Sequence, residues 1–396
     1  MLHGKANLIQ LAIAIRGVST GSQSQRFFKK CIYILYLTKD LVLSVMRKPK
    51  VLFTTYLYAF QIFGGAEIQL LKTKEYLDKI GGCDVKLFDI FSDRIREFDI
   101  LHNFLMFDSC LPLARIAKEA GTKFALSSIY IPANQSLLQK INLSSLERLY
   151  TNVRQRGYLT SRDWYPYKEF LELADIILPN SQMEADRLSN YFKINPEKFQ
   201  IVPNGVDERF ASGDPNLFVE KYGLDNFVLH VARIYPVKNT LSVIKACIDL
   251  NLPLVIIGKP GPGEEAYFEE CKKIAISSKK IRIIDFLPHD SDELRSAYAA
   301  AKVFVLPSLW ETCGLAALEA GLAGCNIVIT NRGATREYFR NHALYVDPLS
   351  LEDIKSKVKQ AYEEPKTVKL KELILDEYTW KKVAEKTLNA YRIIFN

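Results

Sequence analysis

The stretch PSLWETCGLAALEAGLAGCNIVIT, Pro307–Thr330, contains only two charged residues, Glu311 and Glu319. It begins in the apolar run KVFVLPS (302–308) and ends with a second one, NIVIT (326–330). Continuous apolar runs are typical of strands buried on both faces of a parallel sheet, so the residues between these two runs are expected to form the connecting helix. Glu311 then lies in the loop at the carboxyl end of a parallel strand, where open α/β sheets bind their ligands.

The connecting helix is expected at about Leu315–Gly321, preceded by Gly314. A helix that starts at glycine lets backbone N–H groups approach an anion closely. Glu319 lies four residues after Leu315, on or beside the face directed at the sheet, where a buried carboxylate without a partner is strongly unfavourable. Two interpretations are open at this stage. Either both carboxylates bind a ligand, or Glu311 is solvated and Glu319 pairs with an internal arginine.

Similar apolar runs recur along the chain and alternate with longer helical patterns. They form a first series at 51–55, 84–88, 99–103, 123–127, 175–180 and 199–204, and a second series at 227–233, 254–258, 281–286, 302–308 and 326–330. Strands that alternate with helices predict β-α-β units and parallel sheets. The two series, in a chain of 396 residues, therefore predict an α/β protein of two doubly wound, Rossmann-like domains that face across a cleft and join near 204–215.

Two basic residues are expected at the same sheet edge as Glu311. Arg233 ends the run FVLHVAR, and Lys238 follows five residues later, just before a predicted helix. Two cations beside a helix N-terminus suit a diphosphate, because the side chains balance its charge and the amides donate directed hydrogen bonds. Gly64 and Gly65 can turn tightly against a ligand, but they are not part of a G-x-G-x-x-G sequence, which weakens a dinucleotide-binding interpretation.

The composition is that of a globular protein, with 48% hydrophobic and 25% charged residues. The net charge of +8 comes from the first fifty residues, which contain nine Lys or Arg and one acidic residue, whereas the remainder is neutral. The body of the protein therefore lacks the excess of positive charge that nucleic-acid binding requires. The seven cysteines are scattered without a C-x-x-C pair, which argues against a zinc site or a disulfide framework and favours a reducing, cytoplasmic location.

The basic N-terminal segment, residues 1–49, leaves two interpretations open. Aromatic and aliphatic residues flanked by lysines favour a helix on an anionic membrane surface, which would place the protein at the inner face of the membrane. The alternative is a loosely packed extension, or sequence upstream of a true start at Met46. Lys39 and Asp40 interrupt the apolar runs, so the segment is too short to span a membrane, and it lacks the small-residue cleavage site of a signal peptide.

Seven stretches, in this order and at these intervals, resemble the GT-B glycosyltransferases of the large retaining family four, also called group 1. They are GGAE (64–67), ADIILPNSQMEADRL (174–188), VPNGVD (202–207), VARIYPVKN (231–239), PSLWETCGLAALEAGLAG (307–324), GATREYF (333–339) and ALYVDPLSLEDI (343–354). The resemblance covers about residues 50–396. It implies a basic extension at 1–49, an acceptor-side domain at 50–207, a donor-binding domain at 208–377 and a C-terminal helix at 378–396 that crosses back onto the first domain.

The resemblance also implies a nucleotide-sugar donor, expected to be a UDP- or GDP-sugar, and no metal or other cofactor. Glu319 would bind the ribose hydroxyls, Glu311 would lie beside the transferred sugar, and the helix start at Gly314 would face the diphosphate. The implied catalytic residues are Arg233, Lys238, Glu311 and His102. The implied donor-binding residues are Gly64, Gly65, Arg233, Lys238, Glu311, Cys313, Gly314, Leu315 and Glu319.

The implied reaction is retaining hexosyl transfer to a saccharide or lipid-linked acceptor in cell-surface polysaccharide or glycolipid synthesis. His102, at the end of its run, would orient the acceptor or contact the sugar, and a structural, hydrogen-bonded histidine is the alternative. Ser127 and Ser128 stand where many relatives carry a histidine, which argues against a histidine role in that loop. The basic and aromatic segment 132–166 would cover the acceptor or touch lipid headgroups, unless it forms a solvated helix pair.

Two other functions stay open on the sequence alone. One is a different GT-B reaction, carried out by a nucleotide-sugar epimerase or hydrolase. The other is a non-catalytic relative that only binds a nucleotide sugar.

Overall fold

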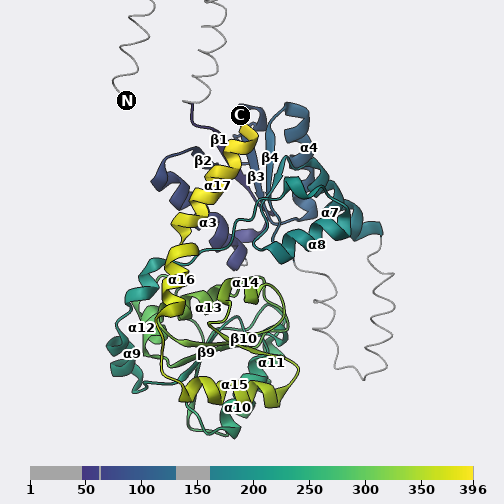
Figure 1. Ribbon diagram of the computed structural model, residues 1–396. Coiled ribbons are helices and arrows are strands. Elements are labelled where there is room, and N and C mark those ends of the chain that lie inside the picture. Colours follow the sequence, from purple (N-terminus) through teal and green to yellow (C-terminus); the bar gives the residue numbers. More distant parts are fainter. Residues whose placement is uncertain (1–46, 62–63, 131–160, 396) are drawn as a thin grey trace, which may run out of the picture. The chain divides into compact units, whose positions relative to one another are not determined.

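The computed structural model describes residues 47–61, 64–130 and 161–395, which contain two parallel sheets with helices on both faces of each (Figure 1). We call the five-stranded sheet with the helices packed on it the first half, and the six-stranded sheet with its helices the second half. The predicted α/β fold of two doubly wound sheets is confirmed.

The first sheet has the strand order β2-β1-β3-β4-β5, with every pair parallel. Its strands are β1 (Lys50–Thr54), β2 (Asp84–Leu87), β3 (Ile100–Phe104), β4 (Lys123–Ser127) and β5 (Ile176–Ile177). Val51 and Phe53 point into one core, and Leu52 points into the core on the other face. The continuous apolar runs of the sequence reflect this burial on both sides.

The second sheet has the order β11-β10-β9-β6-β7-β8, again all parallel. Its strands are β6 (Val228–Val231), β7 (Leu254–Ile257), β8 (Ile281–Ile284), β9 (Val303–Leu306), β10 (Asn326–Thr330) and β11 (Leu344–Val346). The chain winds from β6 to β8 on one side and returns to β9 on the other. The winding direction therefore reverses between β6 and β9, and an open sheet leaves a crevice for a ligand at such a point.

Helices connect the strands in both halves. The first half contains α3 (Gly65–Ile80), α4 (Leu111–Ala120), α7 (Ser161–Leu173) and α8 (Gln182–Phe192). The second half contains α9 (Pro215–Tyr222), α10 (Thr240–Asp249), α11 (Glu265–Ala275), α12 (Asp292–Ala300), α13 (Leu315–Leu322), α14 (Thr335–Phe339), α15 (Leu351–Glu363) and α16 (Lys369–Glu377). The connecting helix predicted at Leu315–Gly321 is thus confirmed, and it ends one residue later.

The last helix, α17 (Trp380–Phe395), packs on the first half although it follows the second half in sequence (Figure 1). Its buried residues share a core with β1 and α3, and the largest of them, Trp380, is 1% exposed. The chain passes between the halves twice, first around Val206 and again around Tyr378. These two passages lie side by side, as the hydrogen bond from the Val206 N–H to the Tyr378 carbonyl at 2.7 Å shows. A Cβ at Gly205 would lie 2.8 Å from the Trp380 ring. The glycine thus allows this close packing.

Two strand predictions were wrong. Residues 199–204 form no strand. Phe199 makes an isolated bridge with Ile177, and the N–H groups of Gln200 and Val202 donate to this neighbouring segment, but the next N–H of the series, that of Asn204, donates to the Tyr338 hydroxyl instead. The short strand β11 was not predicted, since two of its three residues are only partly buried and its apolar run is brief. The domain limits that the resemblance implies stay a prediction.

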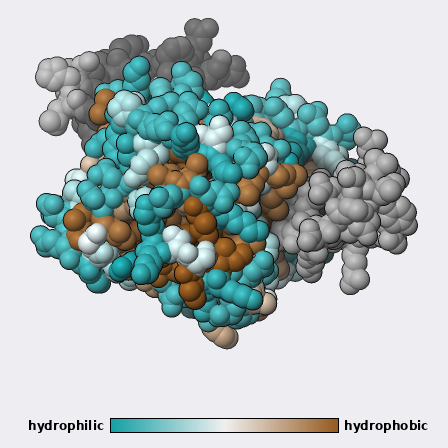
Figure 2. Space-filling model, turned by 90° about the horizontal axis from the view of Figure 1, so that it is seen from below, coloured by the Kyte–Doolittle hydropathy of each residue, from teal (hydrophilic) through white to brown (hydrophobic). Residues whose placement is uncertain are grey.

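Several expectations for the chain ends and loops lie outside the described residues. These are the N-terminal extension up to residue 46 and most of the segment 132–166. Among the helices that the structure describes, none combines the length and the apolar character needed to cross a membrane. On the face seen in Figure 2, hydrophobic residues form separate areas between hydrophilic ones.

The packing of α17 gives a testable expectation for stability. Trp380→Ala should lower the free energy of unfolding of the first half by about 3–5 kcal/mol, because it removes a fully buried ring. Trp380→Phe keeps part of the ring volume and serves as the matched control, with a clearly smaller effect. Thermal unfolding followed by circular dichroism measures both. Small and equal decreases in Tm would contradict a core role for Trp380.

Candidate functional site

Three of the predicted site residues, Arg233, Lys238 and Glu311, gather at the carboxyl edge of the second sheet, where the winding direction reverses. Arg233 follows β6 by two residues, and Lys238 ends the short 3-10 helix Pro236–Lys238 before α10. Glu311 follows the adjacent strand β9. Because β6 and β9 are neighbours, two cations and a carboxylate that are far apart in sequence meet at one edge.

Glu311 and Lys238 form the central ion pair of this edge. The Lys238 ammonium donates to Oε1 of Glu311, which also accepts a hydrogen bond from the Ser308 hydroxyl at 2.6 Å. Glu311 is only 6% exposed, so the pair replaces hydration that the carboxylate has lost. Burial alone would lower the pKa of Lys238, but the Glu311 carboxylate outweighs it and raises that pKa above its ordinary value. Lys238 therefore stays charged.

The backbone around Glu311 is fixed by a glycine. Gly333 has φ +93° and a Cβ there would overlap the Glu311 carbonyl, so only glycine fits this position. The Glu311 carbonyl accepts a hydrogen bond from Ala334 N–H at 3.1 Å. The loop that carries the carboxylate is thereby tied to the loop after β10.

The start of α13 follows directly after this loop. Gly314 is its N-cap with φ +76°, and no side chain caps the first N–H groups of the helix. Cys313 is 2% exposed and its sulfur accepts a hydrogen bond from the Asn204 amide at 3.2 Å. Burial raises the pKa of the Cys313 thiol to about 12. The thiol therefore stays protonated.

The glycine pair of the first half lies against this edge. Gly64 is the N-cap of α3. A Cβ at Gly64 would lie 3.6 Å from a guanidinium nitrogen of Arg233, and a Cβ at Gly65 would lie 3.4 Å from Leu315. Leu315 packs against the cores of both halves. The helix starts of α3 and α13 and the Arg233 guanidinium are therefore brought together, although they come from three separate parts of the sequence.

Glu319 lies one helical turn into α13 and is 7% exposed. Its Oε1 is 2.6 Å from Nε2 of His289, and its Oε2 accepts a hydrogen bond from the Tyr298 hydroxyl at 2.8 Å. The expectation that this carboxylate needs partners was right, but the alternative of an arginine partner was wrong, since the partners are a histidine and a tyrosine.

His102 does not lie where the sequence placed it. It is the third of the five residues of β3 rather than the last, and it is 1% exposed. Its Nδ1 lies 2.6 Å from the Tyr391 hydroxyl of α17, and its Nε2 lies 3.0 Å from the Ser127 hydroxyl. Burial lowers the pKa of His102 to about 3, so the ring is neutral. These contacts match the structural, hydrogen-bonded alternative, and the predicted position at the sheet edge was wrong.

Sequence reasoning missed a buried carboxylate next to Gly64. Glu67 is 3% exposed and accepts hydrogen bonds from the Gly64 N–H at 2.7 Å and from the Tyr56 hydroxyl at 2.6 Å. It holds the glycine turn that faces Arg233. The signal was present in GGAE, since a Glu three residues after an N-cap position is the second half of a capping box.

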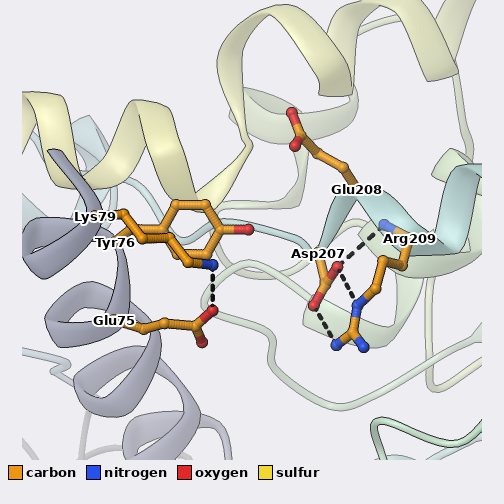
Figure 3. A pocket seen from close by; sticks show the side chains of 6 residues that line it. All are labelled: Glu75, Tyr76, Lys79, Asp207, Glu208 and Arg209. Atoms are coloured by element: carbon orange, nitrogen blue, oxygen red, sulfur yellow. Dashed lines mark hydrogen bonds and ion pairs between the residues drawn. The ribbon is translucent and has the colours of Figure 1, made fainter.

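A pocket of about 370 Å³ lies away from these residues, between α3 and the first passage between the halves (Figure 3). It is lined by Glu75, Tyr76, Lys79, Asp207, Glu208 and Arg209. Burial alone would raise the pKa of Asp207, but the hydrogen bonds and charge of Arg209 hold that pKa well below its usual range. None of the predicted site residues lines this pocket.

Comparison with protein families gives two matches that follow each other along the chain. The profile described as glycosyltransferase family 4 matches residues 77–210, and the profile described as glycosyl transferases group 1 matches residues 218–374. The second match contains Arg233, Lys238, Glu311 and Glu319.

Curated relatives are similar over part of their length. D-inositol 3-phosphate glycosyltransferase of Rhodococcus jostii is 27% identical over 244 residues, which is 56% of this chain and 53% of the relative. The enzyme of the same name from Actinosynnema mirum is 32% identical over 39% of this chain and 40% of the relative. The chain thus spans about half the length, or less, of these curated relatives.

Solved structures match over most of the chain. Sucrose-phosphate synthase from Thermosynechococcus elongatus has a TM-score of 0.68 at 15% identity, covering 88% of this chain and 99% of that chain. A glycosyltransferase from Rickettsia africae has a TM-score of 0.67 at 16% identity with the same coverage. Anabaena HepE, in complex with UDP and glucose, has a TM-score of 0.65 at 14% identity, covering 87% of this chain and 100% of that chain. At these identities the likeness shows the fold, which is GT-B. The family matches and the fold agree, and the chain belongs to the group 1 glycosyltransferases.

Proposed function

We propose that this protein transfers a hexose from a nucleoside-diphosphate sugar to a saccharide or lipid-linked acceptor, with retention of the anomeric configuration. One observation carries the proposal. Arg233, the Lys238–Glu311 pair and the start of α13 converge at the point where the second sheet reverses its winding. This arrangement combines cations and the backbone N–H groups of a helix start for a diphosphate with carboxylates for hydroxyl groups.

The donor would lie along α13. The diphosphate would sit at the uncapped helix start after Gly314, between Arg233 and Lys238, with the glycine turn at Gly64 and Gly65 close enough for backbone contact. The ribose hydroxyls would donate to Glu319. The complex of HepE with UDP and glucose supports a UDP-sugar as the first donor to test, since that protein has the same fold.

The chemistry follows from charge. When the glycosyl–phosphate bond breaks, negative charge grows on the departing diphosphate and positive charge grows on the sugar. Preorganised donors at the developing anion can stabilise the transition state by about 3–4 kcal/mol each. Arg233 and Lys238 would supply this stabilisation without a metal ion, and Glu311 would lie beside the sugar ring and hold Lys238 in place.

The acceptor would bind beside the first half. We propose attack from the same face as the departing diphosphate, with a phosphate oxygen taking the proton of the acceptor hydroxyl. This route fits the site better than a double displacement, because Glu311, the carboxylate proposed to lie beside the sugar ring, is already paired with Lys238. A cytoplasmic location, with or without attachment of residues 1–49 to the inner membrane face, stays a prediction, as does a role in cell-surface polysaccharide or glycolipid synthesis.

The role of Arg233 can be tested by substitution. Arg233→Ala should lower turnover at least about tenfold, because it removes a cation from the departing diphosphate. Release of nucleoside diphosphate from the best donor in a panel of UDP- and GDP-sugars measures turnover, and circular dichroism checks the fold. Arg392→Ala, on the exposed side of α17, is the matched control and should leave turnover unchanged. Full turnover in Arg233→Ala would refute the leaving-group role.

The role of Glu319 predicts a loss of donor affinity. Glu319→Gln keeps the size of the side chain but removes the charge that makes it a strong acceptor, so the affinity for UDP should fall about tenfold, which corresponds to about 1.4 kcal/mol. Isothermal titration calorimetry measures the change. Unaltered UDP binding in this variant would place the ribose elsewhere.

A further inference from the structure

We infer that His289 is a positioning residue for the nucleoside. It holds the Glu319 carboxylate in an orientation that leaves one hydrogen-bond acceptor site on each oxygen for a vicinal diol. This inference rests on the proposed function, since it assigns the diol to the ribose of a nucleoside diphosphate. It goes beyond it by giving a specific task to a loop residue that lies thirty positions before Glu319 in sequence.

The acceptor sites of the Glu319 carboxylate can be counted. An ionised carboxylate offers about four lone-pair sites, two on each oxygen. His289 occupies one site on Oε1 at 2.6 Å, and the Tyr298 hydroxyl occupies one on Oε2 at 2.8 Å. One site is left on each oxygen. The 2′- and 3′-hydroxyls of a ribose are two adjacent donors, so their number matches the remaining acceptors.

The two partners differ in how firmly they are held. Tyr298, on α12, is completely buried in the core of the second half. Its hydroxyl stays protonated, because burial and, next, the Glu319 carboxylate raise its pKa well above 10. His289 lies on the loop between β8 and α12, with 32% of its side chain exposed and its ring 5.6 Å from that of Phe210. Without His289, Oε1 would lose its only described partner, and the carboxylate could rotate about its last side-chain torsion.

Charged groups from other elements surround this histidine. Burial alone would lower the pKa of His289, but the Glu319 carboxylate on α13 outweighs it and raises that pKa above 6.5. Lys72 of α3 opposes the rise and Asp207 of the first passage between the halves adds to it. Lys72 and Asp207 also lie 3.5 Å apart, as an ion pair. Protonated or neutral, the imidazole can donate its Nε2 hydrogen to Glu319, so the positioning role holds on both sides of the titration.

The test compares ribose with deoxyribose nucleotides. Titration calorimetry with UDP and with 2′-deoxy-UDP should show that the unaltered protein prefers the ribose form by about tenfold or more, because a site built for a hydroxyl is left with an unpaired acceptor when the hydroxyl is missing. In His289→Ala this preference should fall to about twofold or less. His289→Gln, whose amide can still donate to Glu319, should restore most of it. His342→Ala, near the amino end of β11, is the matched control and should keep the full preference.

The outcomes separate the inference from the proposed function. If the unaltered protein binds neither UDP, GDP nor ADP, the proposed function fails. If it binds a ribonucleotide and His289→Ala weakens the ribose and deoxyribose forms equally, the histidine only supports the fold of the loop and the inference is overturned. An unchanged preference in His289→Ala overturns it as well.

A pH series adds a second readout. Because the folded-state pKa of His289 is raised above its unfolded value, its pair with Glu319 adds stability that is complete below pH 6.5 and is lost as the pH rises through the folded pKa. The Tm of the unaltered protein should therefore exceed that of His289→Gln by more at pH 6 than at pH 9. A difference that does not change with pH would show that no such pair forms.

Discussion

Two carboxylates that are less than a tenth exposed impose the main constraint on this structure. Glu311 and Glu319 are 6% and 7% exposed, and an ionised group removed from water needs compensation from charges or hydrogen-bond donors. The protein supplies it from other elements: Lys238 after β6 compensates Glu311, while residues from the β8–α12 connection and from α12 compensate Glu319. Compensating the two charges therefore brings four parts of the chain together around the start of α13: the segments that follow β6 and β9, the β8–α12 connection, and α12.

The topology explains why these elements meet. In the second sheet β6 lies beside β9, so residues that follow the two strands reach the same edge although more than seventy positions separate Lys238 from Glu311. The first sheet has its own reversal between β1 and β3, and the segment after β1 brings Gly64 close to Arg233. Both halves thus present the kind of edge at which α/β sheets bind ligands, and the close approach of Gly64 to Arg233 and of Gly65 to Leu315 joins the two edges.

The fold could be predicted from the sequence because a strand buried on both faces appears as a continuous apolar run. The same signal failed at 199–204, where apolar residues such as Val202 are buried in a connection that pairs with β5 only once. Arg233, Lys238, Glu311 and Glu319 could be selected as candidate site residues because each is a charge at or just after an otherwise apolar stretch. Neither His289 nor Tyr298 could be assigned to Glu319, since their pairing depends on how α12 packs beside α13. The position of His102 was misjudged because β3 continues to Phe104, and its Tyr391 partner arrives from the far end of the chain.

The packing of α17 means that the first half is not a continuous piece of polypeptide. Its core is completed by residues that follow the whole second half in sequence and are therefore synthesised after it. During synthesis, β1 and α3 must therefore wait with an uncovered apolar face until Trp380 and Tyr391 become available, whereas the second half can close once α15 and α16 have followed its strands. A shortened product that stops before residue 380 would leave the same surface permanently open to aggregation or to chaperones.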